Sequence, residues 1–435
     1  MPELLLIVIF ACALLACVLA GVSVLVALAF GYMLFFGYGL WRGRGWRLLL
    51  SDSLAGMRTV VVVLSAFCLI GALTASWRAC GTIATIVSWS YGACQPGLMV
   101  PATFLLCSLV SLLTGTSFGS AATMGVICMA MAGSMGISPA LAGGAMLSGV
   151  YFGDRCSPMS TSALLVCALT RTSLHDNLRR MLRTGAVPFA ITLAAYAALA
   201  PAGSPAVGTP VPELLEAHFT LTWPTLLPAV IVLVLAFLRV GVKTSMGLSL
   251  ACALVLAVAV QGMPPGEALL ACVTGFSPAD PDIARLLGGG GVLSMATVFC
   301  IVCVASCYAG IFRGTRFLDG VIGHVRSLAR RVTPFGAVLA TAVLTSVVAC
   351  NQTLAIMLTH QLCEPLARRR DLAIHLENTA VVIAPLVPWS IAGAVPLALC
   401  GAPLSSLPLS FLLVLIPLWN LAMALRGRGG GRRVR

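Results

Sequence analysis

Two opposite charges, Asp154 and Arg155, stand side by side in GVYFGDRCSPMSTS (149–162), which follows a long run of small and apolar residues. A carboxylate at membrane depth costs on the order of a few kcal/mol and usually faces a partner or a water-filled cavity. Asp154 could therefore bind a cation, carry a proton, or pair with Arg155 at a helix end. The preceding glycine and the Ser-Pro pair that follows predict a broken helix, which favours a functional role.

Hydroxyl groups gather at a second predicted break, TGTSFGS (114–120), where two glycines let the backbone approach a ligand closely. The hydroxyls belong to Thr114, Thr116, Ser117 and Ser120. Oxygen ligands with few fixed charges suit a small hard cation. Ordinary helix packing is the alternative for any one of these residues, but the cluster as a whole favours a site.

The second half of the chain has polar residues beside two further breaks, at 350–353 and 385–390. Glu377 is either an acid that satisfies a helix N-terminus or part of a site. Asn351 contributes an amide, with a buried, satisfied polar group as the alternative. Trp389 either lines a cavity or anchors a helix at the membrane interface.

The composition predicts an all-α polytopic membrane protein, because 60% of the 435 residues are hydrophobic and only 9% are charged. About eleven to thirteen hydrophobic segments are long enough to cross a bilayer or to enter it deeply. The first begins at Leu4 without a charged leader, so we expect it to be retained as membrane helix.

The net charge of +13 comes from short arginine clusters between apolar segments and not from a basic domain, so we expect no nucleic-acid partner. The sequence has no phosphate-binding loop with lysine, no H-E-x-x-H and no G-x-S-x-G. We therefore expect a secondary transporter with no cofactor and no enzymatic activity. Cys80 and Cys94 flank a predicted loop, and the sequence leaves open whether they pair.

Charge also predicts the topology of the connecting segments. Basic clusters at 42–47, 171–183, 239–243 and 313–331, with the tail at 426–435, are expected in the cytoplasm. The segments 201–222 and 263–287 carry acidic residues and together contain a single arginine, so they are expected outside. The cluster at 368–370 is not placed by this pattern.

An internal repeat is the second organising feature. Segments 75–87 and 108–120 resemble 310–322 and 342–354, each at an offset of about 235 residues. Since the loop from Trp77 to Pro96 is expected outside and its arginine-rich counterpart after Ile311 is expected inside, the two repeats are predicted to be inverted. The predicted organisation is an N-terminal repeat (1–200), an external linker (201–222), a C-terminal repeat (223–425) and a basic cytoplasmic tail (426–435).

Segments 114–126, 137–160, 171–183, 350–358 and 376–393 resemble the NhaC-type sodium/proton antiporters, an ion-transporter family with inverted repeats, and YFGDRCSPMS is the most specific part. The resemblance implies a scaffold bundle, a transport bundle with broken helices or re-entrant hairpins, and alternating-access exchange of Na+ for H+. It implies cation binding or proton carriage by Thr116, Ser117, Asp154, Ser157, Ser160, Asn351, Glu377 and Trp389. A sodium ion would bind at Asp154, Thr116 and Ser157.

Two positions, Thr161 and Asn378, depart from the aspartates expected at these points of the family pattern. Both changes remove a negative charge near the expected cation, which predicts weaker Na+ binding and fewer protons per cycle. Relatives of this family also move organic acids or amino acids with Na+ or H+ as the coupling ion. A carrier of such a solute is therefore the alternative to Na+/H+ exchange, and a passive channel or a non-transporting receptor is an alternative from another class.

The expected partners are the lipid bilayer and a small cation, and the sequence leaves a homodimer open. The resemblance implies a multi-pass protein of the bacterial inner membrane, and the basic tail places the C-terminus in the cytoplasm.

Overall fold

The structure is a computed structural model that describes residues 2–19, 22–58, 61–90, 95–200, 211–238, 240–315, 333–349 and 351–430. Within these ranges the ordered elements are helices, and an isolated bridge between Phe276 and Gly289 is the extended pairing observed. The predicted all-α class is confirmed. Cys94, much of the linker (201–210), Arg239, the basic loop at 316–332 and the end of the tail (431–435) lie outside the described residues.

The first half contains α1 (Pro2–Leu19), α2 (Val24–Trp41), α3 (Trp46–Arg58), α4 (Val61–Ala79), α5 (Thr82–Ser90), α6 (Pro96–Thr114), α7 (Ser117–Ser120), the π-helix η1 (Ala121–Gly125), α8 (Val126–Ser134), α9 (Pro139–Cys156), α10 (Thr161–Thr170), α11 (Leu174–Leu199) and α12 (Val211–His218). The second half contains η2 (Trp223–Leu226), α13 (Leu227–Phe237), α14 (Val242–Ala259), α15 (Pro265–Thr274), α16 (Pro281–Leu287), η3 (Val292–Met295), α17 (Ala296–Thr315), α19 (Pro334–Ala349), α20 (Gln352–Cys363), η4 (Glu364–Leu366), α21 (Arg369–Glu377), α22 (Ala380–Ile383), η5 (Ala384–Leu386), α23 (Ile391–Leu399), η6 (Leu404–Ser406) and α24 (Phe411–Gly430).

Many of these helices have the length and composition of membrane spans. Among the described residues, five are long and apolar enough to cross a membrane, or up to eight if each of three bent pairs is one span. Five shorter apolar helices accompany them. Together these elements agree with the predicted eleven to thirteen hydrophobic segments, and the chain is a multi-pass membrane protein.

The helix breaks recur at the spacing of the sequence repeat. α6 ends at Thr114 and α7 begins at Ser117; α19 ends at Ala349 and α20 begins at Gln352, so both boundaries recur 235 positions later. The break between α9 and α10 has a counterpart between η5 and α23 at a slightly shorter offset of 230 positions, since α9 ends at 156 and η5 at 386. These coincidences support the repeat, whereas its inverted orientation and the division at 201–222 stay predictions.

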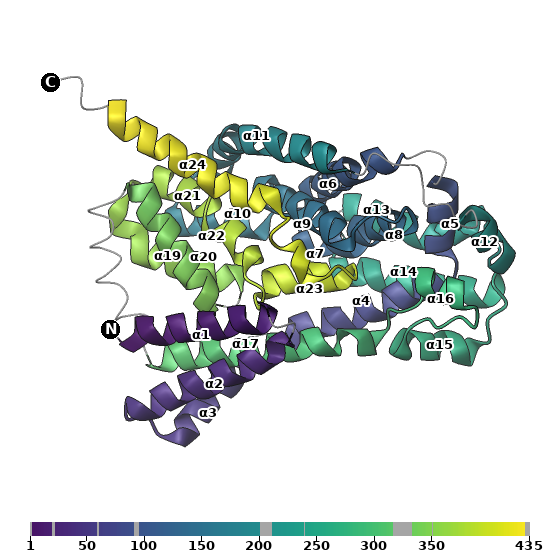
Figure 1. Cartoon of the computed structure of the whole chain (residues 1–435), viewed down its shortest axis with the longest axis horizontal. Coiled ribbons are helices and arrows are strands. Elements are labelled where there is room, and N and C mark those ends of the chain that lie inside the picture. The colour runs from purple at the N-terminus through teal and green to yellow at the C-terminus, as the bar shows by residue number, and fades with distance from the viewer. Residues whose placement is uncertain are drawn as a thin grey trace.

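Four groups of buried side chains hold the helices together, and the smallest joins α9, α10, α11 and α21. A central core joins α4, α5, α6, α8, α9 and α14, and another group joins α10 with α19 to α22. The third, an aromatic cluster of Phe10, Phe35, Tyr308, Phe312 and Trp389, joins α1, α2 and α17 to the segment before α23. Both chain ends lie at one end of the long axis, and α12, α15 and α16 lie at the other (Figure 1).

The α6–α9 contact positions the GVYFGDRCSPMSTS stretch. It is close because α9 presents glycines to α6, and small residues of this kind let membrane helices approach each other. A Cβ on Gly153 would lie 2.2 Å from the backbone nitrogen of Leu112. Ser111 on α6 also donates a hydrogen bond to the carbonyl oxygen of Val150 on α9.

We expect Gly153→Ala to destabilise the protein by about 1–3 kcal/mol or more, because the added methyl group meets α6 backbone, which cannot rotate away. The midpoint of thermal unfolding in detergent measures the effect. Gly266→Ala on α15 is the matched control, since a Cβ there meets no heavy atom within 4 Å. Equal midpoints for the two variants would contradict the close contact.

Candidate functional site

The helix that carries Asp154 ends just after it. α9 stops at Cys156, because Pro158 lacks an N–H and disfavours helical backbone at the preceding residue. Ser157 is accordingly extended, with φ −85° and ψ 139°. Its hydroxyl oxygen accepts a hydrogen bond from the Met159 N–H at 3.1 Å. The predicted break is present, and the Ser157 hydroxyl helps to form the turn.

The Asp154 side chain is buried, with 3% of its surface exposed, and meets groups from three segments. Ser160 donates a long hydrogen bond of 3.5 Å to its Oδ1, and Ser162 donates to its backbone carbonyl at 3.2 Å. The backbone of Ser117 and the side chain of Gln352 lie close to the carboxyl group, and the Gln352 amide nitrogen donates to the carbonyl oxygen of Val381 at 2.9 Å. Asp154 therefore lies where the breaks of the first half meet the start of α20 from the second.

Arg155 is fully buried and connects three parts of the chain. Among the described residues no ion pair joins it to Asp154, so the pairing that the sequence left open is not formed. Its guanidinium group instead donates to α11 and to the junction of α21 and α22. The acceptors are Glu377 O at 3.2 Å, Met181 O at 3.1 Å, Thr184 Oγ1 at 3.1 Å and Asn378 Oδ1.

Glu377 is the last residue of α21, so its interpretation as a helix N-terminal acid is wrong. Its side chain is fully buried, and neither carboxyl oxygen has a hydrogen-bond partner among the described residues. The charges of Arg155 and Asp154 both act on it. The site thus contains a second acid, Glu377, whose two carboxyl oxygens can each still accept a hydrogen bond or bind a cation.

Thr116 and Ser117 lie on the other side of the site, at the start of α7. The Thr116 hydroxyl oxygen is buried without a hydrogen-bond partner among the described residues. It lines a cavity of about 200 Å³ between the break at 115–116 and residues such as Gly241 and Ser245 near the start of α14. The π-helix η1 follows at once, and such bulges are frequent at functional sites.

Two predicted site residues of the second half have mainly structural contacts. Asn351 caps α20, its side-chain oxygen accepting from the Leu354 N–H at 2.8 Å. Trp389 is 6% exposed, donates to the carbonyl oxygen of Val347 at 2.9 Å and packs against Phe10 in the aromatic cluster. Trp389 thus joins the segment before α23 to α1.

The two departures from the family pattern lie in different surroundings. Thr161, the first residue of α10, is exposed, whereas Ser160 and Ser162 on either side are buried against Asp154. An acid at 161 would therefore point away from Asp154. Asn378 is buried and keeps its oxygen on Arg155, so it replaces an expected ion pair by a neutral hydrogen bond.

Sequence reasoning missed Tyr151 and Ser162. Tyr151 is buried, donates to the carbonyl oxygen of Ala392 at 2.6 Å, and lies close to Ser117 and Asp154. Its position three residues before Asp154 puts both side chains on one helix face, and this spacing is the signal that could have identified it.

Buried acids at breaks in membrane helices, next to unpaired hydroxyl and carboxyl oxygens, are typical of secondary transporters. The polytopic helical fold and this site together place the protein in the class of secondary transporters. The chain belongs to the Na+/H+ antiporter family, whose model matches residues 149–427. It is a secondary transporter.

Relatives extend the similarity to most of the chain. The Na(+)/H(+) antiporter NhaC of Alkalihalophilus pseudofirmus is 26% identical over 411 residues, which cover 91% of this chain and 88% of that protein. The malate-2H(+)/Na(+)-lactate antiporter of Bacillus subtilis is 28% identical over an alignment that covers 77% of this chain and 74% of that protein. The arginine/ornithine antiporter ArcD of Halobacterium salinarum is 30% identical over an alignment that covers 82% of this chain and 76% of that protein.

Proposed function

We propose that this protein exchanges Na+ for H+ by alternating access across a bacterial inner membrane. The observation that carries the proposal is that Asp154 and Glu377, two buried acids from the two halves of the chain, lie on segments joined by the hydrogen bonds of Arg155 to Glu377 O and Asn378 Oδ1. The resemblance of the whole chain to NhaC antiporters supports Na+ as the cation. The basic turn at 42–45 and the C-terminal end of α24 would face the cytoplasm.

Asp154 would alternate between a cation and a proton, because a single carboxyl group cannot hold both at once. The hydroxyl of Ser160 donates to it, and the Gln352 side chain lies nearby with its amide nitrogen on the carbonyl oxygen of Val381. Rotation of the Ser160 hydroxyl would present its oxygen to Na+. Thr116 adds a hydroxyl oxygen on the cavity side. Competition for one carboxyl group makes the exchange obligatory.

Glu377 would be the second proton carrier. Its carboxyl oxygens lack hydrogen-bond partners among the described residues, so they remain open to a proton or a cation. Asn378 supplies a neutral oxygen where the family pattern has an acid, and Thr161 is exposed. With no acid at Asn378, we expect fewer protons per cycle than in a relative that has one there.

Purified protein in proteoliposomes with an acidic interior and a pH-sensitive dye tests the proposal. Added Na+ or Li+ should dequench the dye as protons leave, whereas choline should have no effect. Dequenching that does not depend on Na+ or Li+ would rule out Na+/H+ exchange as the function. A linear current–voltage relation without a counter-ion would instead support a channel.

A carrier of an organic acid or an amino acid is the second candidate, favoured by the similarity to a malate/lactate and an arginine/ornithine antiporter. Uptake of radiolabelled lactate, malate, arginine and ornithine, measured in the same vesicles with and without a Na+ gradient, separates the candidates. Uptake of one solute that exceeds protein-free vesicles, together with no Na+-dependent dequenching, would replace the first candidate.

A further inference from the structure

A basic basin lies where the turn between α10 and α11 faces the start of α21. It is a cavity of about 940 Å³ whose lining includes six arginines and two aspartates. The arginines are Arg171, Arg179, Arg180, Arg368, Arg369 and Arg370. Two arginine clusters that are almost 200 residues apart in sequence therefore share one surface, and the transport chemistry uses none of them.

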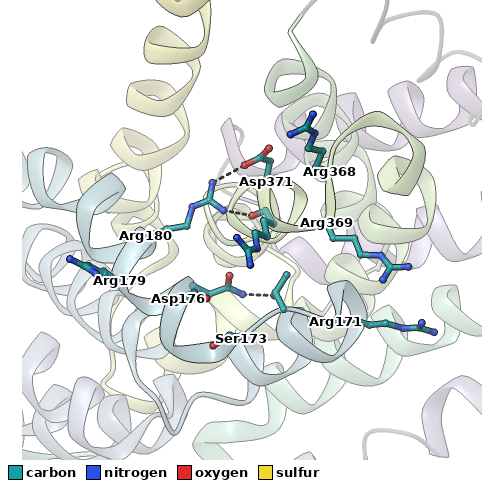
Figure 2. A pocket seen from close by; sticks show the side chains of 11 residues that line it. Arg171, Ser173, Asp176, Arg179, Arg180, Arg368, Arg369 and Asp371 are labelled. Atoms are coloured by element: carbon teal, nitrogen blue, oxygen red, sulfur yellow. Dashed lines mark hydrogen bonds and ion pairs between the residues drawn. The ribbon is translucent and has the colours of Figure 1, made fainter.

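The acids of the basin leave most of this charge uncompensated. Arg180 forms an ion pair with Asp371 at 2.7 Å and donates to the carbonyl oxygen of Arg370 at 2.6 Å. Figure 2 shows Arg180 reaching across to Asp371, with Arg171, Arg179 and Arg369 spread around the basin. Among the described residues, the other five arginines of the basin form no ion pair within 4 Å. Arginines so close together repel each other unless an anion lies between them.

Two helix starts add to the positive potential. The first turns of α11 and α21 both line the basin, and neither N-cap, Ser173 nor Arg368, makes a side-chain capping hydrogen bond. Helix N-termini carry partial positive charge and free N–H groups that bind phosphate oxygens. Arginine binds phosphate with two parallel N–H donors, so the donors match a phosphate group.

We propose that the basin binds a phosphate-bearing anion, either the headgroup of an acidic phospholipid or free phosphate. α11 is apolar enough to span the membrane and begins at the basin, which places the arginines at the level of lipid headgroups. The bound phosphate would bridge α11 and α21. These helices also carry the backbone groups that bind Arg155, so the bound anion would stabilise the helices that position the site.

Thermal unfolding in detergent tests this proposal without any measurement of transport. Midpoints are recorded during titration with phosphatidylglycerol, phosphatidylcholine and inorganic phosphate at constant ionic strength. Phosphatidylglycerol, but not phosphatidylcholine, should raise the midpoint of the wild type. The double variant R171Q/R369Q should need at least about tenfold more phosphatidylglycerol for the same shift in the unfolding midpoint, since each arginine near an anionic lipid contributes substantially to the free energy of binding. R426Q, outside the basin, should behave like the wild type.

Inorganic phosphate that reproduces the shift would identify free phosphate as the ligand, and its failure would identify the lipid. Equal responses of the wild type and R171Q/R369Q to both ligands would overturn the proposal. If the double variant does not fold, Asp176→Asn gives an independent answer. Removing this acid from the lining should tighten binding severalfold, and unchanged or weaker binding would equally overturn the proposal.

Discussion

Asp154→Asn is expected to reduce Na+-dependent dequenching to the level of protein-free liposomes. Asparagine fills the same space and can still accept from Ser160, so the fold should survive. It cannot exchange a proton for a cation, however, and that exchange is the chemistry assigned to this position. The measurement is the dye assay in proteoliposomes, normalised to the amount of protein inserted.

Glu267→Gln is the matched control for Asp154→Asn. Glu267 is an exposed acid in the first turn of α15, at the end of the molecule opposite the chain termini. It should retain the wild-type signal and the wild-type unfolding midpoint. If Asp154→Asn keeps a Na+-dependent signal of wild-type size, the carboxyl group is not the shared binding site, and Glu377 becomes the leading acid.

Arg155→Leu is expected to destabilise the fold by about 3–5 kcal/mol, because it leaves buried acceptors on α11 and at the α21–α22 junction without donors. Arg155→Lys should recover only part of the loss, since an ammonium group cannot reach all of these acceptors as a planar fork does. Thermal unfolding midpoints and the yield of monodisperse protein measure both effects.

The control for this pair is Arg47→Gln on α3. Arg47 is exposed and lies over the Trp46 ring at 5.3 Å, so its loss should cost no more than about 1 kcal/mol. A midpoint for Arg155→Leu that stays within the range of Arg47→Gln would show that the buried guanidinium contributes little, and that α9 and α21 are held together by apolar packing.

The helix breaks were predictable because local chemistry determines them. Pro158 ends α9, and the polar residues at 115–116 and 351 interrupt their helices at the repeat spacing. The burial of Asp154 followed from its apolar setting. By contrast, Trp389 depends on packing against Phe10, almost the full chain length away, which no local pattern contains.

The orientation of single residues at the breaks was also beyond local reasoning. Thr161 and Ser162 are neighbours, yet only Ser162 faces Asp154, because the cap at Ser160 sets the rotation at which α10 begins. Two of the partners of Arg155, Glu377 and Asn378, lie 222 and 223 positions away. A single sequence gives no signal for such pairs, and the immediate neighbour Asp154 was the natural but wrong partner.

The hydrogen bonds of Arg155 have a mechanical consequence. They tie α9, α11 and the α21–α22 junction into one rigid block, since pulling any of them away would strand a charge in apolar surroundings. A motion that turns Asp154 from one side of the membrane to the other must therefore carry these helices together. Under the proposed alternating access, relative movement would then fall between this block and helices outside it, such as α1, α2 and α17, whose contacts with Trp389 are aromatic and carry no charge.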